Sequence, residues 1–218
     1  MPPKGANLLE YSDEGRDILS KLSSAPLEGF AIHAVDASIN EFMKDAITTV
    51  EKGHFYLLWH LINVEESLED VAENAIIDGG YDEGIDAYLV DHEEKRIRLF
   101  QSKYGISHSI GEIDQFVQDV ERLKEKEQSK LKRDELQYLW KYLNDKRMKV
   151  ELVYITDQFV DDYQNKKVRV MGRNQVYQTL WERIKKPAKG QNASLRILKT
   201  PLEHKNSKVC VVSAFDLA

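Results

Sequence analysis

Residues 84–104 read GIDAYLVDHEEKRIRLFQSKY and predict two strands joined by a tight turn. Apolar and aromatic side chains recur through 85–90 and through 96–104, and the charged residues 92–95 separate the two runs. Strands so close in sequence pair antiparallel as a hairpin. The hairpin is the starting point for both the fold and the candidate site.

Three side chains converge if the turn is symmetric. Asp91 then pairs with Arg96, and continuing the antiparallel register puts Asp86 opposite Gln101. Lys103 points to the same face as Gln101, because side chains alternate along a strand. A β-bulge in either strand would shift this pairing by one residue. A regular hairpin therefore predicts a carboxylate, an amide and an ammonium group on one face.

Such a trio has a chemical use. A carboxylate and a neutral oxygen, here Asp86 and Gln101, can hold Mg²⁺ (or Mn²⁺) while waters complete its coordination. The metal acidifies a water and offsets charge on a phosphodiester, and Lys103 can orient that water or offset the charge. The alternative is an ordinary Asp86–Lys103 salt bridge on an exposed sheet face.

A family resemblance favours the catalytic interpretation. Residues 78–87, DGGYDEGIDA, followed by the hairpin to QSKY at 101–104, resemble the N-terminal nuclease-like domain of the abortive infection phage resistance protein (AIPR) family. That family is similar to the Mrr-type branch of the PD-(D/E)xK nucleases. The matching block covers residues 78–104, and a weaker likeness extends through the following helices. Glu83 stands where the family pattern has glycine.

The resemblance implies a fold, an activity and residue roles. The fold would be a restriction-endonuclease-like three-layer α/β sandwich with a central mixed sheet, and the activity a Mg²⁺-dependent endonuclease of prokaryotic phage defence acting on DNA. Asp86 matches the motif aspartate, Lys103 the motif lysine, and Gln101 stands at the second acidic ligand, in the Q-x-K form of the Mrr-type branch. The chain would be one domain over 1–218, the N-terminal part of a longer protein.

The superfamily also draws a glutamate from its first helix, and Glu41 and Glu51 are the candidates. Apolar spacing predicts a helix over 40–63 with its buried stripe centred near Val50. Glu51 flanks that stripe, whereas Glu41 points away from it. We therefore select Glu51 as an accessory carboxylate; the alternative is a solvated helix glutamate.

Other patterns complete the expected order of elements. Asp78 and Asp82 precede Asp86 in a glycine-rich loop and are expected to cap it; the alternative is that they add metal ligands. Further helices are predicted over 65–74, 110–126, 130–146 and 174–184, and further strands over 150–156, 195–198 and 208–214.

Charge is distributed unevenly along a chain whose net charge is −6. Residues 166–208 hold 12 Lys or Arg and two acids, whereas residues 1–165 are strongly acidic. Clustered basic residues are typical of nucleic-acid binding, and Arg173, Arg183, Lys185 and Lys186 are the candidates. The alternative is a solvated basic face on an acidic protein.

Composition excludes several classes of protein. Hydrophobic residues make up 42% and charged residues 31%, as in a folded globular domain. One cysteine, Cys210, excludes an internal disulfide framework, and no apolar run is long enough for a membrane span, so we expect a cytoplasmic location. Two alternatives to the nuclease stay open: a catalytically silent nucleic-acid-binding or regulatory domain, and an interaction domain whose acidic half recruits a partner. A homodimer is also open.

Overall fold

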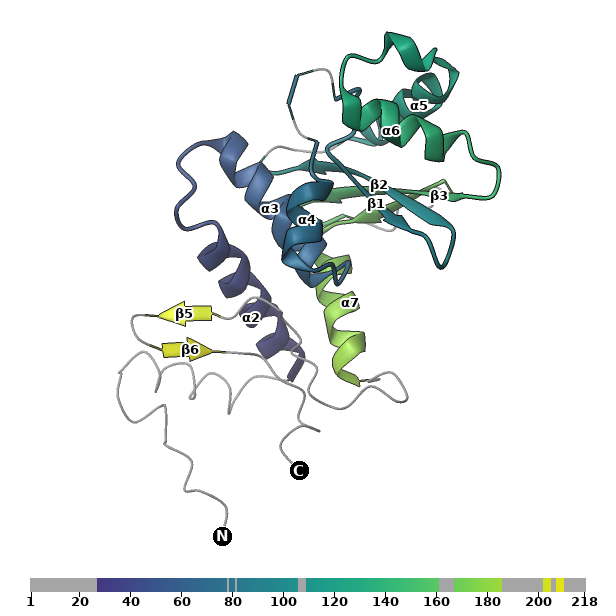
Figure 1. The fold of residues 1–218 in the computed structure, drawn as a ribbon. Helices are drawn as coiled ribbons and strands as arrows, with labels where there is room; N and C mark the ends of the chain where they lie inside the picture. Colours follow the sequence, from purple (N-terminus) through teal and green to yellow (C-terminus); the bar gives the residue numbers. More distant parts are fainter. Residues whose placement is uncertain are drawn as a thin grey trace.

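The computed structural model describes residues 27–77, 79–80, 82–105, 109–160, 167–185, 202–204 and 207–209 (Figure 1). Its helices and strands are, in chain order, α2 (Leu27–Phe42), α3 (Thr49–Asn63), α4 (Glu69–Ala75), β1 (Ala87–Asp91), β2 (Arg96–Lys103), α5 (Ile110–Glu125), the short 3-10 helix η1 (Gln128–Lys130), α6 (Asp134–Leu143), β3 (Lys149–Thr156), β4 (Val168–Met171), α7 (Arg173–Lys185), β5 (Leu202–His204) and β6 (Ser207–Val209).

Four strands form an open mixed sheet in the order β1-β2-β3-β4. β1 and β2 pair antiparallel, with Ala87 opposite Phe100 and Asp91 opposite Arg96, which confirms the symmetric turn. β2, β3 and β4 run parallel, and α5 and α6 lie in the connection between β2 and β3. The fold is therefore mixed α/β, as predicted. β5 and β6 form a separate antiparallel pair.

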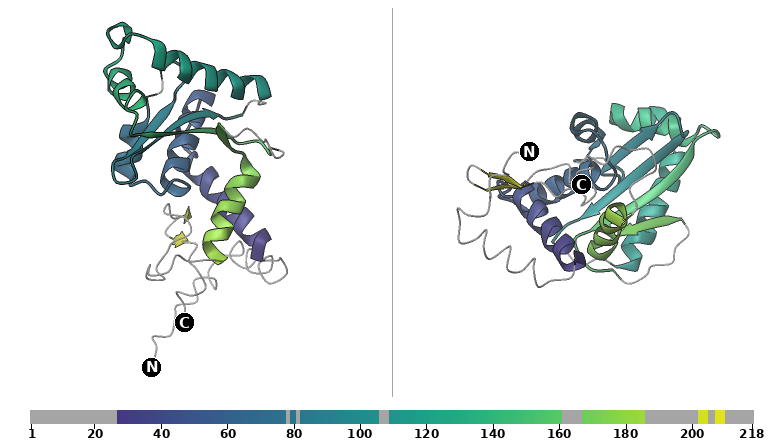
Figure 2. Two further views of the ribbon diagram at one scale, coloured as in Figure 1. Left: turned by 90° about the vertical axis from the view of Figure 1, so that its right-hand side faces the viewer. Right: turned by 90° about the horizontal axis from the view of Figure 1, so that it is seen from below.

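Helices cover both faces of the sheet (Figures 1 and 2). The α3 core, on one face, joins α2, α3, α4 and α7 to the sheet. Its fully buried Trp59 donates a hydrogen bond from Nε1 to Ser38 Oγ at 3.0 Å, which ties α3 to α2. The α5 core, on the other face, packs Phe116 and Leu139 of α5 and α6 against the sheet. Side chains of β2 alternate between the two cores: Leu99 belongs to the α5 core and Phe100 to the α3 core.

The predicted helix over 40–63 is wrong in its first half. α2 ends at Phe42 and α3 begins only at Thr49. Ile47 and Val50, which the sequence pattern placed on the buried stripe, are 88% and 74% exposed. The physical reason is a capping box at Thr48, which stabilises a new helix start at this point.

The other elements follow the sequence pattern with several differences. Sequence patterning misses α2, η1, β4 and β5. α4 begins at Glu69 rather than at 65, and α6 spans Asp134–Leu143 rather than 130–146. The predicted strand over 195–198 and most of that over 208–214 lie outside the described residues. Among the described helices, none combines the length and the apolar character that a membrane crossing demands.

Candidate functional site

The loop before β1 is shaped by two consecutive residues with positive φ. Glu83 has φ 59° and Gly84 has φ 77°, in the left-handed region that favours glycine. Asp82 stabilises the turn, because its Oδ1 accepts from the Gly84 N–H at 2.8 Å; its expected capping role is confirmed. The Glu83 side chain forms an ion pair with Lys126 of the segment after α5. Asp78 lies outside the described residues.

Asp86 leaves this loop and lies at the end of the β1–β2 ladder. Its N–H donates to Phe100 O at 2.9 Å, and its carbonyl accepts from the Ile77 N–H at 2.8 Å. One oxygen of its carboxylate is held by the neighbouring strand, because Oδ2 accepts from the Ser102 N–H at 2.6 Å. The carboxylate is therefore fixed beside the backbone between Gln101 and Lys103.

Gln101 and Lys103 lie two residues apart near the end of β2 and share a face of the sheet. Gln101 is buried, at 8% exposure, and its Nε2 donates to Gly84 O at 3.1 Å. This bond leaves Oε1 as the end of the amide that can coordinate a cation. Lys103 is half-buried. The structure thus brings the three hairpin residues of the predicted site to one place.

Two neighbours of this trio were not found from sequence. Tyr154 of β3 is paired in register with Gln101, and its side chain belongs to the α5 core, on the same face. Burial, followed by the carboxylates of Glu112 and Asp86, raises the pKa of the Tyr154 phenol. Glu112 is in the first turn of α5, which follows β2. A parallel register between distant strands leaves no local sequence signal.

Glu51 is not brought to this trio. Its carboxylate closes the α3 capping box, accepting from the N–H groups of Ile47 and Thr48 at 2.9 and 2.7 Å. These bonds hold the pKa of Glu51 below its usual value. Val50, on which its selection depended, is exposed, so the helical-phase argument is wrong.

Helical phase also turns Glu51 away from the end of β2. Two glycines show which residues of α3 lie against the end of β2. A Cβ atom placed on Gly105 would lie 3.8 Å from Thr49 Cγ2, and one placed on Gly53 would lie 4.0 Å from Tyr104 Cβ. Thr49 and Gly53 therefore mark the face of α3 that meets the end of β2. Glu51 is two residues from each, about 200° round a helix of about 3.6 residues per turn.

The predicted nucleic-acid contacts are described in part. Arg173 at the start of α7 faces Asp36 of α2, with its Nε 3.2 Å from Asp36 Oδ1. Tyr177 donates a hydrogen bond to the same carboxylate. Arg183 and Lys185 lie in the last turns of α7, and Lys186 lies outside the described residues. Arg173 thus has a structural partner within the chain.

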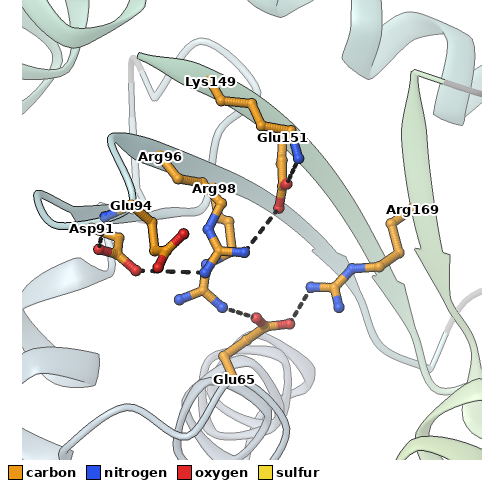
Figure 3. Close-up of polar contacts among 8 residues, drawn as sticks. All are labelled: Glu65, Asp91, Glu94, Arg96, Arg98, Lys149, Glu151 and Arg169. Carbon is orange, nitrogen blue, oxygen red and sulfur yellow. Dashed lines mark hydrogen bonds and ion pairs between the residues drawn. The ribbon is translucent and has the colours of Figure 1, made fainter. Parts of the chain in front are cut away.

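The opposite face of the sheet carries a buried charge cluster, which sequence reasoning missed (Figure 3). Glu65, just after α3, has a side chain only 3% exposed and pairs with Arg98 of β2 and Arg169 of β4. Nε2 of the buried His60 lies 3.6 Å from Glu65 Oε1. Burial acts to raise the pKa of Glu65, but His60, Arg169 and Arg98 outweigh it and hold the pKa at about 2.

Charges continue along this face of the hairpin. Arg96 lies between Asp91 and Glu151, and Lys149 pairs with Glu151 at 2.6 Å (Figure 3). Each charge in this row has an opposite partner, so the row joins neighbouring strands. We assign it a structural role.

No family model, curated protein or solved structure matches the chain. Within the described ranges, no group of three or more His, Cys, Asp or Glu side chains is placed to hold a metal ion. Inferences about function therefore depend on the geometry around Asp86 and on the motif resemblance.

Proposed function

We propose that the protein is a metal-dependent endonuclease that hydrolyses phosphodiester bonds in DNA and acts in prokaryotic anti-phage defence. One observation carries the proposal: the Asp86 carboxylate accepts a hydrogen bond from the Ser102 N–H, at the strand position between Gln101 and Lys103. This is the arrangement that the AIPR-like and PD-(D/E)xK-like motif calls for. The resemblance supplies the defence role.

The donor atoms suit Mg²⁺ or Mn²⁺. Asp86 offers a carboxylate and Gln101 an amide oxygen, and hard cations of this kind take oxygen ligands and keep several waters. When bound, the cation would acidify a water and offset the charge on the phosphodiester. Asp86 and Gln101 would hold it in place.

Lys103 has a separate role. Its ammonium group, on the face of Gln101, would orient the attacking water and offset the charge that grows on the phosphate oxygens. Loss of this lysine should lower the rate of cleavage and leave the metal ligands unchanged. Loss of Asp86 should remove the one charged ligand contributed by the hairpin.

The test compares cleavage of plasmid DNA, single-stranded DNA and RNA by the purified chain with Mg²⁺, with Mn²⁺ and with EDTA. Asp86→Asn should abolish both metal binding and cleavage. Lys103→Ala should retain metal binding and slow cleavage by about 10²–10⁴-fold, the usual contribution of one positioned catalytic group. Lys95→Ala, in the exposed hairpin turn, is the matched control.

Two results would contradict the assignment. If both site variants cut as well as the unaltered chain, the site is wrong. If the unaltered chain binds no metal at millimolar concentration, the catalytically silent nucleic-acid-binding domain replaces the enzyme. One observation favours that second candidate: Gln101 is neutral at the position where the motif has a second acidic ligand.

A further inference from the structure

Tyr154 has a buried hydroxyl group without a visible purpose in the fold. The residue is 0% exposed, and its Oη has no hydrogen-bond partner among the described residues. Buried hydroxyl groups are almost always bonded, and each exception indicates a water, an ion or a functional role. Phenylalanine would fill the same space without this cost, so the hydroxyl itself calls for an explanation.

The surroundings of Tyr154 point to the candidate site. Its register partner is Gln101, so the two side chains lie on one face of neighbouring strands. Phe116 and Ile113 of α5 belong to the same core as Tyr154, so α5 covers this part of the sheet. Glu112 immediately precedes Ile113 at the start of that helix.

Glu112 is held in position by its own helix. Ser109 Oγ accepts from the Glu112 N–H at 3.2 Å, and Glu112 Oε2 accepts from the Ser109 N–H at 2.7 Å. This capping box fixes one carboxylate oxygen, while a carboxylate has two oxygens able to accept or coordinate. Burial raises the pKa of the Tyr154 phenol most, and the charges of Glu112 and then Asp86 add to the rise, so both carboxylates act on the same hydroxyl group.

We propose that Glu112 supplies a second carboxylate to the divalent-cation site at Asp86 and Gln101, and that the Tyr154 hydroxyl donates a hydrogen bond to a water on that cation. The proposal rests on the proposed function and extends it. Because Gln101 is neutral, β2 contributes no carboxylate to the proposed metal site. Glu112 of α5 would supply that second negative charge. Two carboxylates, an amide oxygen and waters are a sufficient set for Mg²⁺ or Mn²⁺.

The test titrates Mn²⁺ by calorimetry into the full chain and into four variants, and records cleavage in parallel. Glu112→Gln removes the charge yet keeps the capping box, in which glutamine also serves. Tyr154→Phe removes only the hydroxyl group. Asp86→Asn reports on the proposed function itself. Glu125→Gln, an exposed position on the last turn of α5, is the matched control.

Tyr154→Phe should weaken Mn²⁺ binding by about 10- to 100-fold, the usual effect of losing a hydrogen bond behind a metal site. Glu112→Gln should weaken it at least as much, and Glu125→Gln should match the unaltered chain. Thermal melting in EDTA checks that each variant is folded. A variant that melts like the unaltered chain but binds Mn²⁺ weakly supports the proposal.

The possible failures are distinguishable. If Asp86→Asn abolishes Mn²⁺ binding and cleavage while Glu112→Gln and Tyr154→Phe change neither, the assignment of Glu112 and Tyr154 is overturned and the nuclease stands. If the unaltered chain neither binds Mn²⁺ nor cuts, the proposed function and this extension are both overturned.

Discussion

Glu65 shows what a single buried charge does in this fold. Its carboxylate lies among His60, Arg98 and Arg169, and its pKa is held at about 2, below the ordinary value of 4.5. The ionised form is therefore stabilised in the folded state. A carboxyl group with a lowered pKa contributes its full stability above the unfolded value and loses it as the pH falls through the folded value.

Replacing Glu65 by glutamine should lower the free energy of unfolding by about 3 kcal/mol near neutral pH, because the buried carboxylate is lost as counter-charge to the partly buried Arg98 and the more exposed Arg169. The difference from the unaltered chain should hold above about pH 4.5 and shrink steadily towards pH 2. Urea unfolding at a series of pH values measures it. Glu93→Gln, in the exposed hairpin turn, is the control, and a difference that stays constant down to pH 2 would contradict the pKa.

At the residue scale, the sequence predicts those site residues whose partners are local. Asp86 and Gln101 could be matched because one short turn sets the hairpin register. Tyr154 and Glu112 could not be matched, because the parallel pairing of β2 with β3 is set by how α5 and α6 pack in three dimensions. Glu65 was missed for the same reason, since its partners lie on β2 and β4.

The start of α3 is a prediction at the scale of one element. Thr48 caps the helix, and its Oγ1 accepts from the Glu51 N–H at 3.2 Å. Thr48→Ala should cost about 1 kcal/mol of stability, the usual loss for an N-cap threonine. Thr49→Ala, one residue on, removes no cap and should have a smaller effect. Equal losses in chemical unfolding would show that the cap is not what separates α2 from α3.

The capping box could have been read from the sequence. Thr48 and Glu51 have the spacing that marks a helix start, whereas the apolar periodicity from 43 to 61 predicts one continuous helix. Periodicity fails here because it cannot say whether an apolar residue is covered, and nothing covers Ile47 or Val50 in the described structure. β2, α5 and β3 were predictable because they are long and strongly patterned.

At the scale of the whole molecule, one sheet supports two cores, so they should unfold together. Trp59 lies within the α3 core, and Trp140 packs against the α5 core. Two variants separate the signals. Replacing Trp181 and Trp140 by phenylalanine leaves Trp59 to report on the α3 core, and replacing Trp181 and Trp59 leaves Trp140 to report on the α5 core. Leu139→Ala should lower stability by about 2–5 kcal/mol and shift both fluorescence transitions equally. A shift confined to Trp140 would show independent units.

Odd- and even-numbered side chains of β2 lie on opposite faces of the sheet and have different roles. Even-numbered Arg98 joins the buried Glu65, whereas odd-numbered Gln101 and Lys103 face α5 and the candidate site. Inserting a single residue between Arg98 and Gln101 would reverse the parity of everything after it. The amide and the ammonium group would then turn towards α3, and Ser102 would replace them. An added residue in the turn at 92–95 would leave the alternation of β2 unchanged, whereas the length of β2 itself can change only by two residues at a time if the site is to keep its face.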